Sequence, residues 1–242
     1  MVKRYHVSDI LARFLPAYRQ QHAISYQQAK CCQHIMDCRT AKLGTQQWQC
    51  NHCDYEQLHY CSCRDRHCPR CQGQKTQQWV EDQKGQVINT RYFHLVFTLP
   101  HELNVITHYA QSELYSELFE AVSKTLNKFA HNRKRLKGQL GITMVLHTWG
   151  QTLSQHIHMH CLVPGGVLDA SNHWQSVKTD YLFPVKALSR VFKAKMFEAL
   201  RSRKVSIPDA DKLMSMPWCV YSKACLTKPE TVIKYLSRST QK

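Results

Sequence analysis

The chain has 242 residues, 43% hydrophobic and 21% charged, which is typical of a globular protein and excludes a disordered or low-complexity chain. No apolar run approaches the roughly 20 residues that span a bilayer, and the N-terminus lacks the pattern of a signal peptide, so a cytoplasmic protein without a membrane partner is expected. The net charge of +16 favours nucleic acid as the partner, with anionic lipid or a generic basic surface as the alternatives.

The cysteines are crowded into one part of the chain. Nine of the twelve lie between Cys31 and Cys71. In a reducing compartment such crowding indicates metal binding rather than disulfide bonds. A metal-binding module is therefore expected in the first third of the chain.

Two kinds of segment make up this first third. Residues 8–37 have apolar side chains at steps of three and four, which predicts amphipathic helices with a break or a helix start at Pro16. Residues 43–73 are rich in Cys, His, Arg and Gln and almost lack aliphatic side chains, so a bound metal has to stabilise them. Residues 74–88 are polar and are predicted to form a helix that links this segment to the rest of the chain. We expect a helical and zinc-binding domain over residues 1–88.

Two Cys-x-x-Cys motifs, CNHC at 50–53 and CPRC at 68–71, lie inside the metal segment. Two such pairs complete a four-thiolate shell for structural zinc, and their spacing is typical of a zinc ribbon or finger. The first choice of ligands is Cys50, Cys53, Cys68 and Cys71, followed by Cys63 and His67. A second site remains open, drawn from His59, Cys61, Cys63 and His67, with Cys38 as a further candidate. Cys31, Cys32 and Cys61 are otherwise expected to be packing or surface residues.

Three arginines, Arg64, Arg66 and Arg70, share the loops that carry the predicted zinc ligands. Guanidinium groups on a rigid loop suit contact with phosphate, because little conformational entropy is lost on binding. The alternative is a solvated basic loop. We expect DNA contacts from these three side chains.

The rest of the chain alternates strands and helices without a regular βα repeat. Strands are predicted over 91–100, 141–150 and 156–166, and helices over 108–131, over 184–203 and from Pro229 onward. This order predicts an α+β fold with an antiparallel sheet in a second domain, residues 89–242.

The segment HIHMH places His156, His158 and His160 on one face of a strand, because side chains alternate with period two. Two neighbouring imidazoles on one face can chelate a divalent ion. The short polar turn QTLSQ joins this strand to the one predicted over 141–150, so the two are expected to form a hairpin. On its other arm, His147 is the best third ligand, and His94 and Glu102 are alternatives. We therefore expect a metal site on this face.

On a basic protein bound to DNA, a divalent ion such as Mg²⁺ or Mn²⁺ would polarise the scissile phosphate. The nucleophile would be either water or a tyrosine that stores the bond energy in a phosphotyrosyl link. Tyr235 lies on the last predicted helix, beside Lys234 and Arg238. The residues alone do not distinguish a catalytic tyrosine from one in the core.

Several segments together resemble the insertion-sequence-91 family of rolling-circle transposases. They are CRTAKLGTQQWQCNHC, SCRDRHCPRCQGQK, FHLVFTLPHEL, VLHTWGQTLSQHIHMHCLVPGG and KYLSRS, and they run from about Cys38 to Arg238. The resemblance implies an N-terminal zinc-binding domain and a histidine-hydrophobe-histidine nuclease domain. It implies that His158 and His160 hold the catalytic metal, that His147 is a weaker match to a third ligand, and that Tyr235 is the nucleophile.

Such an enzyme nicks single-stranded DNA at the ends of the element and holds the 5′ phosphate on tyrosine. This chain departs from the family pattern at Ser239, where a second tyrosine is expected, and it stops at Lys242, where family members continue. A catalytically impaired DNA-binding remnant or regulator is therefore one alternative, and a replication initiator or relaxase is another. All of these functions predict a cytoplasmic protein that is associated with the nucleoid.

Overall fold

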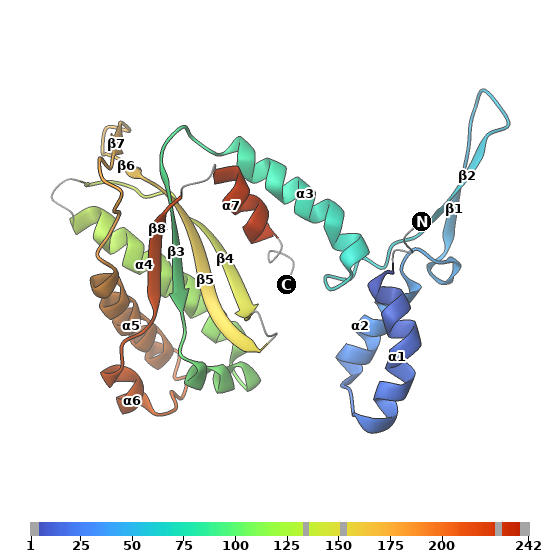
Figure 1. The fold of residues 1–242 in the computed structure, drawn as a ribbon, viewed down its shortest axis with the longest axis horizontal. Coiled ribbons are helices and arrows are strands. Elements are labelled where there is room, and N and C mark those ends of the chain that lie inside the picture. Colours follow the sequence, from blue (N-terminus) through green and yellow to red (C-terminus); the bar gives the residue numbers. More distant parts are fainter. Residues whose placement is uncertain (1–4, 133–135, 151–153, 226–228, 238–242) are drawn as a thin grey trace. The chain divides into compact units, whose positions relative to one another are not determined.

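The computed structural model describes residues 5–132, 136–150, 154–225 and 229–237. The chain forms two compact units, of which the first ends at Asp82 and the second begins at Gln83, a few residues before the predicted boundary at 88 (Figure 1). Within the described ranges, no helix has both the length and the apolar character that crossing a membrane requires.

The first unit begins with two helices that contact each other, α1 (Val7–Gln21) and α2 (Tyr26–Asp37). The prediction of a break or a helix start at Pro16 is wrong, because α1 continues through this residue. The true break follows α1, where the Ser25 hydroxyl accepts a hydrogen bond from the Gln28 backbone N–H at 3.2 Å and so caps α2. An N-cap serine of this kind defines where a helix begins.

A short 3-10 helix, η1 (Ala41–Leu43), precedes a hairpin of two strands, β1 (Thr45–Gln49) and β2 (Glu56–Tyr60). Every residue of both strands is exposed. Gly44 joins η1 to β1 with a φ of 88°, a conformation that favours glycine. The unit ends within α3 (Pro69–Gly85), whose first residue is a proline, as suits the first turn of a helix.

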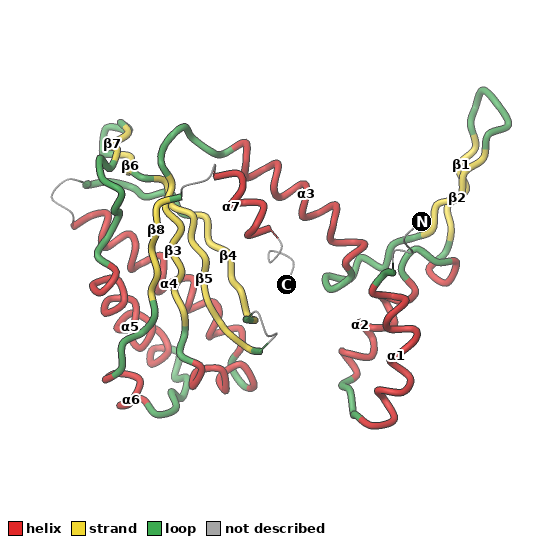
Figure 2. Tube along the Cα trace, in the orientation of Figure 1, coloured by secondary structure: helices red, strands yellow, loops and turns green. Residues whose placement is uncertain are grey.

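The second unit contains a four-stranded sheet of β3 (Tyr92–Thr98), β4 (Thr143–Trp149), β5 (Gln155–Pro164) and β8 (Val220–Ala224). The strand order is β4-β5-β3-β8 and every neighbouring pair is antiparallel (Figure 2). Two helices, α4 (Gln111–Asn132) and α5 (Val185–Ser202), contact each other beside the sheet. The predicted α+β fold with an antiparallel sheet is confirmed.

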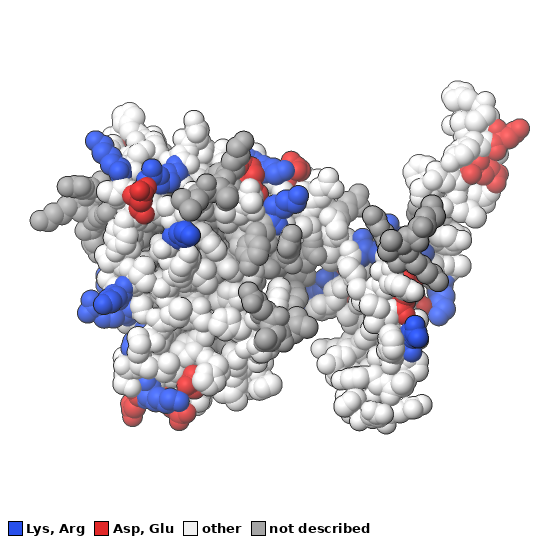
Figure 3. All heavy atoms as spheres, in the orientation of Figure 1, with Lys and Arg blue, Asp and Glu red and all other residues white. Residues whose placement is uncertain are grey.

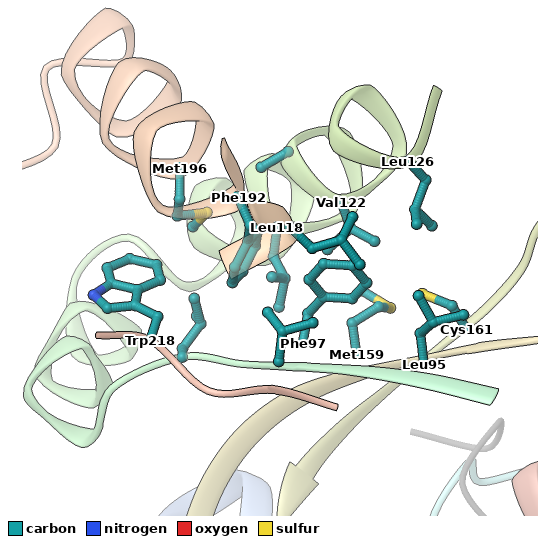
Figure 4. Close-up of a cluster of buried hydrophobic side chains, with 14 of the residues drawn as sticks. Leu95, Phe97, Leu118, Val122, Leu126, Met159, Cys161, Phe192, Met196 and Trp218 are labelled. Atoms are coloured by element: carbon teal, nitrogen blue, oxygen red, sulfur yellow. The ribbon is translucent and has the colours of Figure 1, made fainter. Parts of the chain in front are cut away.

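The core of this unit lies between one face of the sheet and these two helices (Figure 4). The sheet contributes Phe97 and Met159, which are completely buried, and α5 contributes Phe192, whose ring lies 5.1 Å from that of Phe97. Each fully buried side chain of this size stabilises the fold by about 1.5–3 kcal/mol. The alternation along β5 sends Ile157, Met159 and Cys161 into this core, so the histidines between them lie on the opposite face.

The remaining elements of the second unit are short. They are η2 (His101–His108), β6 (Gly166–Leu168), β7 (Trp174–Ser176), α6 (Ala210–Ser215) and α7 (Pro229–Leu236). Of these, η2 contacts β5, and so does α7. Its residues Ile233 and Leu236 are buried, yet they do not belong to the core beneath α4 and α5. We infer that α7 covers the histidine face of the sheet.

Candidate functional site

Four cysteines converge in the first unit. Their sulfur atoms all lie within 4.8 Å of one another, and two of the four are completely buried. One comes from the end of α2, one from the loop after β2, and two from the start of α3. This four-cysteine cluster consists of Cys38, Cys63, Cys68 and Cys71.

The dimensions of the four-cysteine cluster suit zinc. The Cys71 sulfur lies 3.4 Å from that of Cys38 and 3.6 Å from that of Cys63. A tetrahedral zinc with Zn–S bonds of about 2.3 Å requires sulfur–sulfur distances of about 3.8 Å. Burial raises the thiol pKa of Cys38 and of Cys63, while at Cys71 hydrogen bonds from the neighbouring thiols outweigh burial and lower the pKa. A cation would relieve this crowding by stabilising all four thiolates.

The structure places Cys50 and Cys53 outside this cluster, so it does not bring the four first-choice ligands together, and a zinc-binding role for these two cysteines stays a prediction. Both lie in the turn of the β1–β2 hairpin, where the Cys50 backbone N–H bonds to Tyr55 O. Five residues at about 3.3 Å each carry this turn roughly 17 Å beyond the start of the strands. The predicted ligands Cys63, Cys68 and Cys71 do belong to the four-cysteine cluster, and Cys38 takes a place that the sequence assigned only to a second site.

His67 also lies outside the four-cysteine cluster. It groups instead with Cys31 and Asp65, with one possible ligand atom from each residue within 4.8 Å of the others. Cys31 was expected to be a packing or surface residue, but the structure places it beside two other possible metal ligands. Asp65 carried no predicted role at all.

The three loop arginines have different surroundings. Arg70 donates a hydrogen bond from Nη1 to the Cys38 carbonyl at 3.0 Å and so ties α3 to the end of α2. Arg66 donates from Nε to His67 Nε2 at 3.2 Å. Arg64 is exposed and, with Arg39, borders a hollow of about 450 Å³ at the base of the hairpin. Arg64 and Arg66 are thus exposed, Arg70 is partly buried, and contact of the three side chains with DNA stays a prediction.

Positive charge does not gather into one patch on the face drawn in Figure 3. Lysine and arginine side chains are spread over the second unit, and carboxylates lie on the hairpin, where Asp54 and Glu56 are exposed. The excess of basic residues therefore gives a diffuse attraction for polyanions on this face.

In the second unit, the strand register places the predicted histidines together. His147 of β4 lies directly opposite His158 of β5, and Val145 lies opposite His160. Residues that are opposite in an antiparallel pair share a face of the sheet. Ligand atoms of three side chains lie within 4.8 Å of one another, and they form the three-histidine group His147, His158 and His160.

Hydrogen bonds orient two of the three rings. His158 Nδ1 lies 2.8 Å from the backbone carbonyl of His156, an acceptor, so Nδ1 carries the proton and Nε2 is left with a lone pair. His160 Nδ1 lies 2.8 Å from His94 Nε2. Burial, followed by the charges of the neighbouring histidines, lowers the pKa of His160 to about 2, so its ring is neutral. Three imidazoles at this separation fit one divalent ion.

The other predicted candidates stay outside the three-histidine group. His156 lies on the same face but is exposed. Glu102 forms an ion pair with Lys212, in which Oε1 lies 2.9 Å from Nζ. Trp149, for which the sequence predicts no role, stacks on His147 with ring centroids 5.4 Å apart. His94 is not a member of the group, but its Nε2 atom contacts Nδ1 of His160, a predicted ligand.

His94→Ala is expected to weaken the binding of Mn²⁺ by about 10- to 100-fold, because the substitution removes the hydrogen bond at His160 Nδ1. Contacts that orient a metal ligand typically contribute this much to affinity. Isothermal titration with Mn²⁺ measures the effect, with the exposed His173→Ala as the control. Equal affinities in the two variants would contradict an orienting role for His94.

The backbone of Tyr235 lies on α7, the helix that contacts β5. Its side chain lies outside what the structure describes, as do Arg238 and Ser239. The tyrosine is thus on an element that covers the histidine face, and its role as nucleophile stays a prediction.

Comparison with known proteins gives two family matches. A family model of insertion-sequence-91 transposases, described as "Transposase zinc-binding domain", matches residues 10–99, and one described as "Putative transposase" matches residues 141–242. The first match confirms the zinc-binding domain that the cysteines predict. The second spans the three-histidine group and α7.

Curated relatives agree with these matches. The chain is 36% identical over 256 residues to "Putative transposase y4qJ" of Sinorhizobium fredii, which covers 98% of this chain and 64% of that protein. It is 33% identical over 145 residues to "Transposase for insertion sequence element IS801" of Pseudomonas savastanoi pv. phaseolicola, which covers 59% of this chain and 34% of that protein. The chain thus spans between about one third and two thirds of the length of these relatives.

Among solved structures, the relaxase TrwC complexed with a 27-mer DNA is similar over 46% of this chain and 44% of that chain, with a TM-score of 0.37 and 19% identity. The two family matches and the curated relatives, together with the cysteine and histidine motifs, identify the family. The chain belongs to the insertion-sequence-91 family of transposases.

Proposed function

We propose that this chain cuts and rejoins single-stranded DNA at the ends of a mobile element through a covalent link to Tyr235. The observation that supports this most is the three-histidine group, on the sheet face that contacts the helix of this tyrosine. Membership of a transposase family supplies the substrate class. This function places the chain at the nucleoid.

Each residue would have a defined task. The three-histidine group would hold a divalent ion, which when bound polarises the scissile phosphate and balances its charge in the transition state. A nitrogen-only set of protein ligands suits Mn²⁺ better than Mg²⁺, and phosphate oxygens would complete the shell. The His156 carbonyl keeps the proton of His158 on Nδ1, and His94 Nε2 would do the same at His160 when His94 carries its own proton on Nδ1.

Tyr235 would act as the nucleophile. Its phenol gives a proton to water, and the oxygen attacks the phosphorus as the bond from phosphorus to the 3′ oxygen breaks. The 3′ oxygen takes a proton from water and leaves as a free hydroxyl, while the 5′ phosphate stays on the tyrosine. Attack by a 3′ hydroxyl on the phosphotyrosyl link reverses these changes and rejoins a strand.

DNA contacts outside the cutting site would come from the basic loops. Arg64 and Arg66 are exposed beside the four-cysteine cluster, which would hold their loop rigid when zinc is bound. Arg238, near Tyr235 in sequence, is a further candidate. Binding through contacts between basic side chains and DNA phosphates weakens as the salt concentration increases.

Ser239 favours a second candidate function, because the family pattern has another tyrosine at this position. A serine hydroxyl has a far higher pKa than a phenol and is a poor replacement without a base. With one tyrosine the chain would cut once and would lack the second transfer step. If Tyr235 were inactive as well, it would bind DNA without cutting and act as a regulator.

Labelled single-stranded oligonucleotides incubated with the chain and Mn²⁺ test the proposal. We expect a protein–DNA adduct that survives denaturing electrophoresis, and we expect it to vanish in Tyr235→Phe but not in Tyr221→Phe, a substitution of an exposed tyrosine on β8. Double-stranded oligonucleotides should give no adduct. Tight binding with no adduct on any terminal sequence would instead support the regulator, and an adduct retained by Tyr235→Phe would overturn the assignment.

A further inference from the structure

We propose that Cys31, Asp65 and His67 form a second zinc site in the first unit, beside the four-cysteine cluster. One possible ligand atom from each residue lies within 4.8 Å of the other two. Sulfur, oxygen and nitrogen are the three donor types that zinc accepts in proteins. The proposal concerns the zinc-binding unit alone and does not depend on how the second unit acts on DNA.

The spacing of the donors suits a tetrahedral ion. The Cys31 sulfur lies 4.0 Å from Asp65 Oδ1. Zn–S and Zn–O bonds of usual length put these two atoms about 3.5 Å apart, so a shift of about half an ångström closes the shell. Three protein ligands leave a fourth position for water, as in open zinc sites.

Asp65 is held in place from two directions. Its Oδ1 atom accepts the His67 backbone N–H at 2.8 Å, and its Oδ2 atom lies 2.9 Å from His34 Nδ1. Both oxygens still have lone pairs available for a cation. Hydrogen bonds that orient a ligating carboxylate are typical surroundings of a protein metal site. His34 would therefore be a positioning residue.

The position of these residues in the chain explains why two sites would lie side by side. Cys31, His34 and Cys38 are three, four and seven residues apart on α2, so they project from one face of the helix. Asp65 and His67 lie between the cluster ligands Cys63 and Cys68. Each zinc would thus fasten the same helix to the same loop.

If His67 binds the ion through Nε2, one hydrogen bond has to open. Arg66 donates from Nε to His67 Nε2 at 3.2 Å, and both side chains are exposed. Exposed contacts of this kind contribute little free energy, so a cation can displace the arginine at small cost. It follows that removing Arg66 should leave the affinity for the second ion unchanged or should raise it.

The zinc content of the full chain tests the proposal. In a His158→Ala, His160→Ala background, which removes the other metal group, we expect two zinc ions per chain after dialysis. Adding Cys31→Ser should leave one ion, whereas adding Cys32→Ser, at the next residue of the same helix, should leave two. Circular dichroism and the cobalt spectrum of the four-cysteine cluster show whether each variant is folded.

Two further variants separate a ligand from a hydrogen-bonding residue. Asp65→Asn keeps one oxygen that can accept the His67 backbone N–H and puts an amide nitrogen in place of the oxygen beside His34, but it lacks the charge, and it should lower the affinity for the second zinc at least tenfold. Arg66→Ala should bind it at least as tightly as the parent. A single zinc in the parent, or two that persist in both Cys31→Ser and Asp65→Asn, would overturn the proposal.

Discussion

Replacing His158 and His160 together by alanine is expected to lower the rate of single-strand cleavage by at least about 1,000-fold. Both rings belong to the three-histidine group, so the double variant leaves only one of three ligands for the ion. Metal ions stabilise charge in phosphoryl transfer by several kcal/mol. A loss of about 4 kcal/mol corresponds to roughly 1,000-fold in rate. Adduct formation over time, measured with Mn²⁺ in excess, reports this rate.

The matched control for this prediction is His156→Ala. His156 lies on the same strand and face, but its ring is exposed and outside the three-histidine group. Its contribution is a backbone carbonyl that accepts from His158 Nδ1, and alanine preserves that carbonyl. The control should therefore cut at the parent rate. A double variant that cuts as fast as this control would show that the histidines do not serve catalysis.

Cys38→Ser is expected to release the structural zinc and unfold the first unit, whereas Cys50→Ser should leave both intact. Cys38 is completely buried in the four-cysteine cluster, and Cys50 lies in the hairpin turn. Structural zinc contributes about 10–16 kcal/mol to the folding of small zinc domains, more than so small a core can replace. Zinc content and the rate of limited proteolysis measure the two effects.

The same pair of variants decides between the two ligand sets. The sequence motifs favour Cys50 as a ligand, and the geometry favours Cys38. If Cys50→Ser lost zinc while Cys38→Ser retained it, the four-cysteine cluster would not be the zinc site. Loss of zinc in both variants would mean that more than one site stabilises the unit.

The second unit could be predicted well from sequence, because its strands are regular. HIHMH alternates histidine with apolar residues, and period two alone separates the metal face from the core face. The short polar turn before it predicts the hairpin that brings His147 opposite His158. In contrast, β8 was missed because its five residues show no clear alternation, and it pairs with β3, more than a hundred residues earlier.

The first unit was harder to predict, because metal ligands are brought together by turns rather than by a periodic pattern. The two Cys-x-x-Cys motifs look equivalent in sequence, yet the first lies at the turn of a hairpin whose strand residues are all exposed, away from the four-cysteine cluster. In the sequence, Cys38 resembles an ordinary helical cysteine. Only the structure shows that α2 ends at the four-cysteine cluster. His94 could be named as a candidate from sequence, but only the structure distinguishes a residue that contacts a ligand from a ligand.

The most direct measurement is a crystal structure of the chain soaked in Mn²⁺, with anomalous scattering used to locate the ion. We expect a single strong peak equidistant from the imidazole nitrogens at positions 147, 158 and 160, at bonding distance from each. Anomalous density elsewhere, with these rings hydrogen-bonded only to protein and water, would contradict metal binding by the three-histidine group.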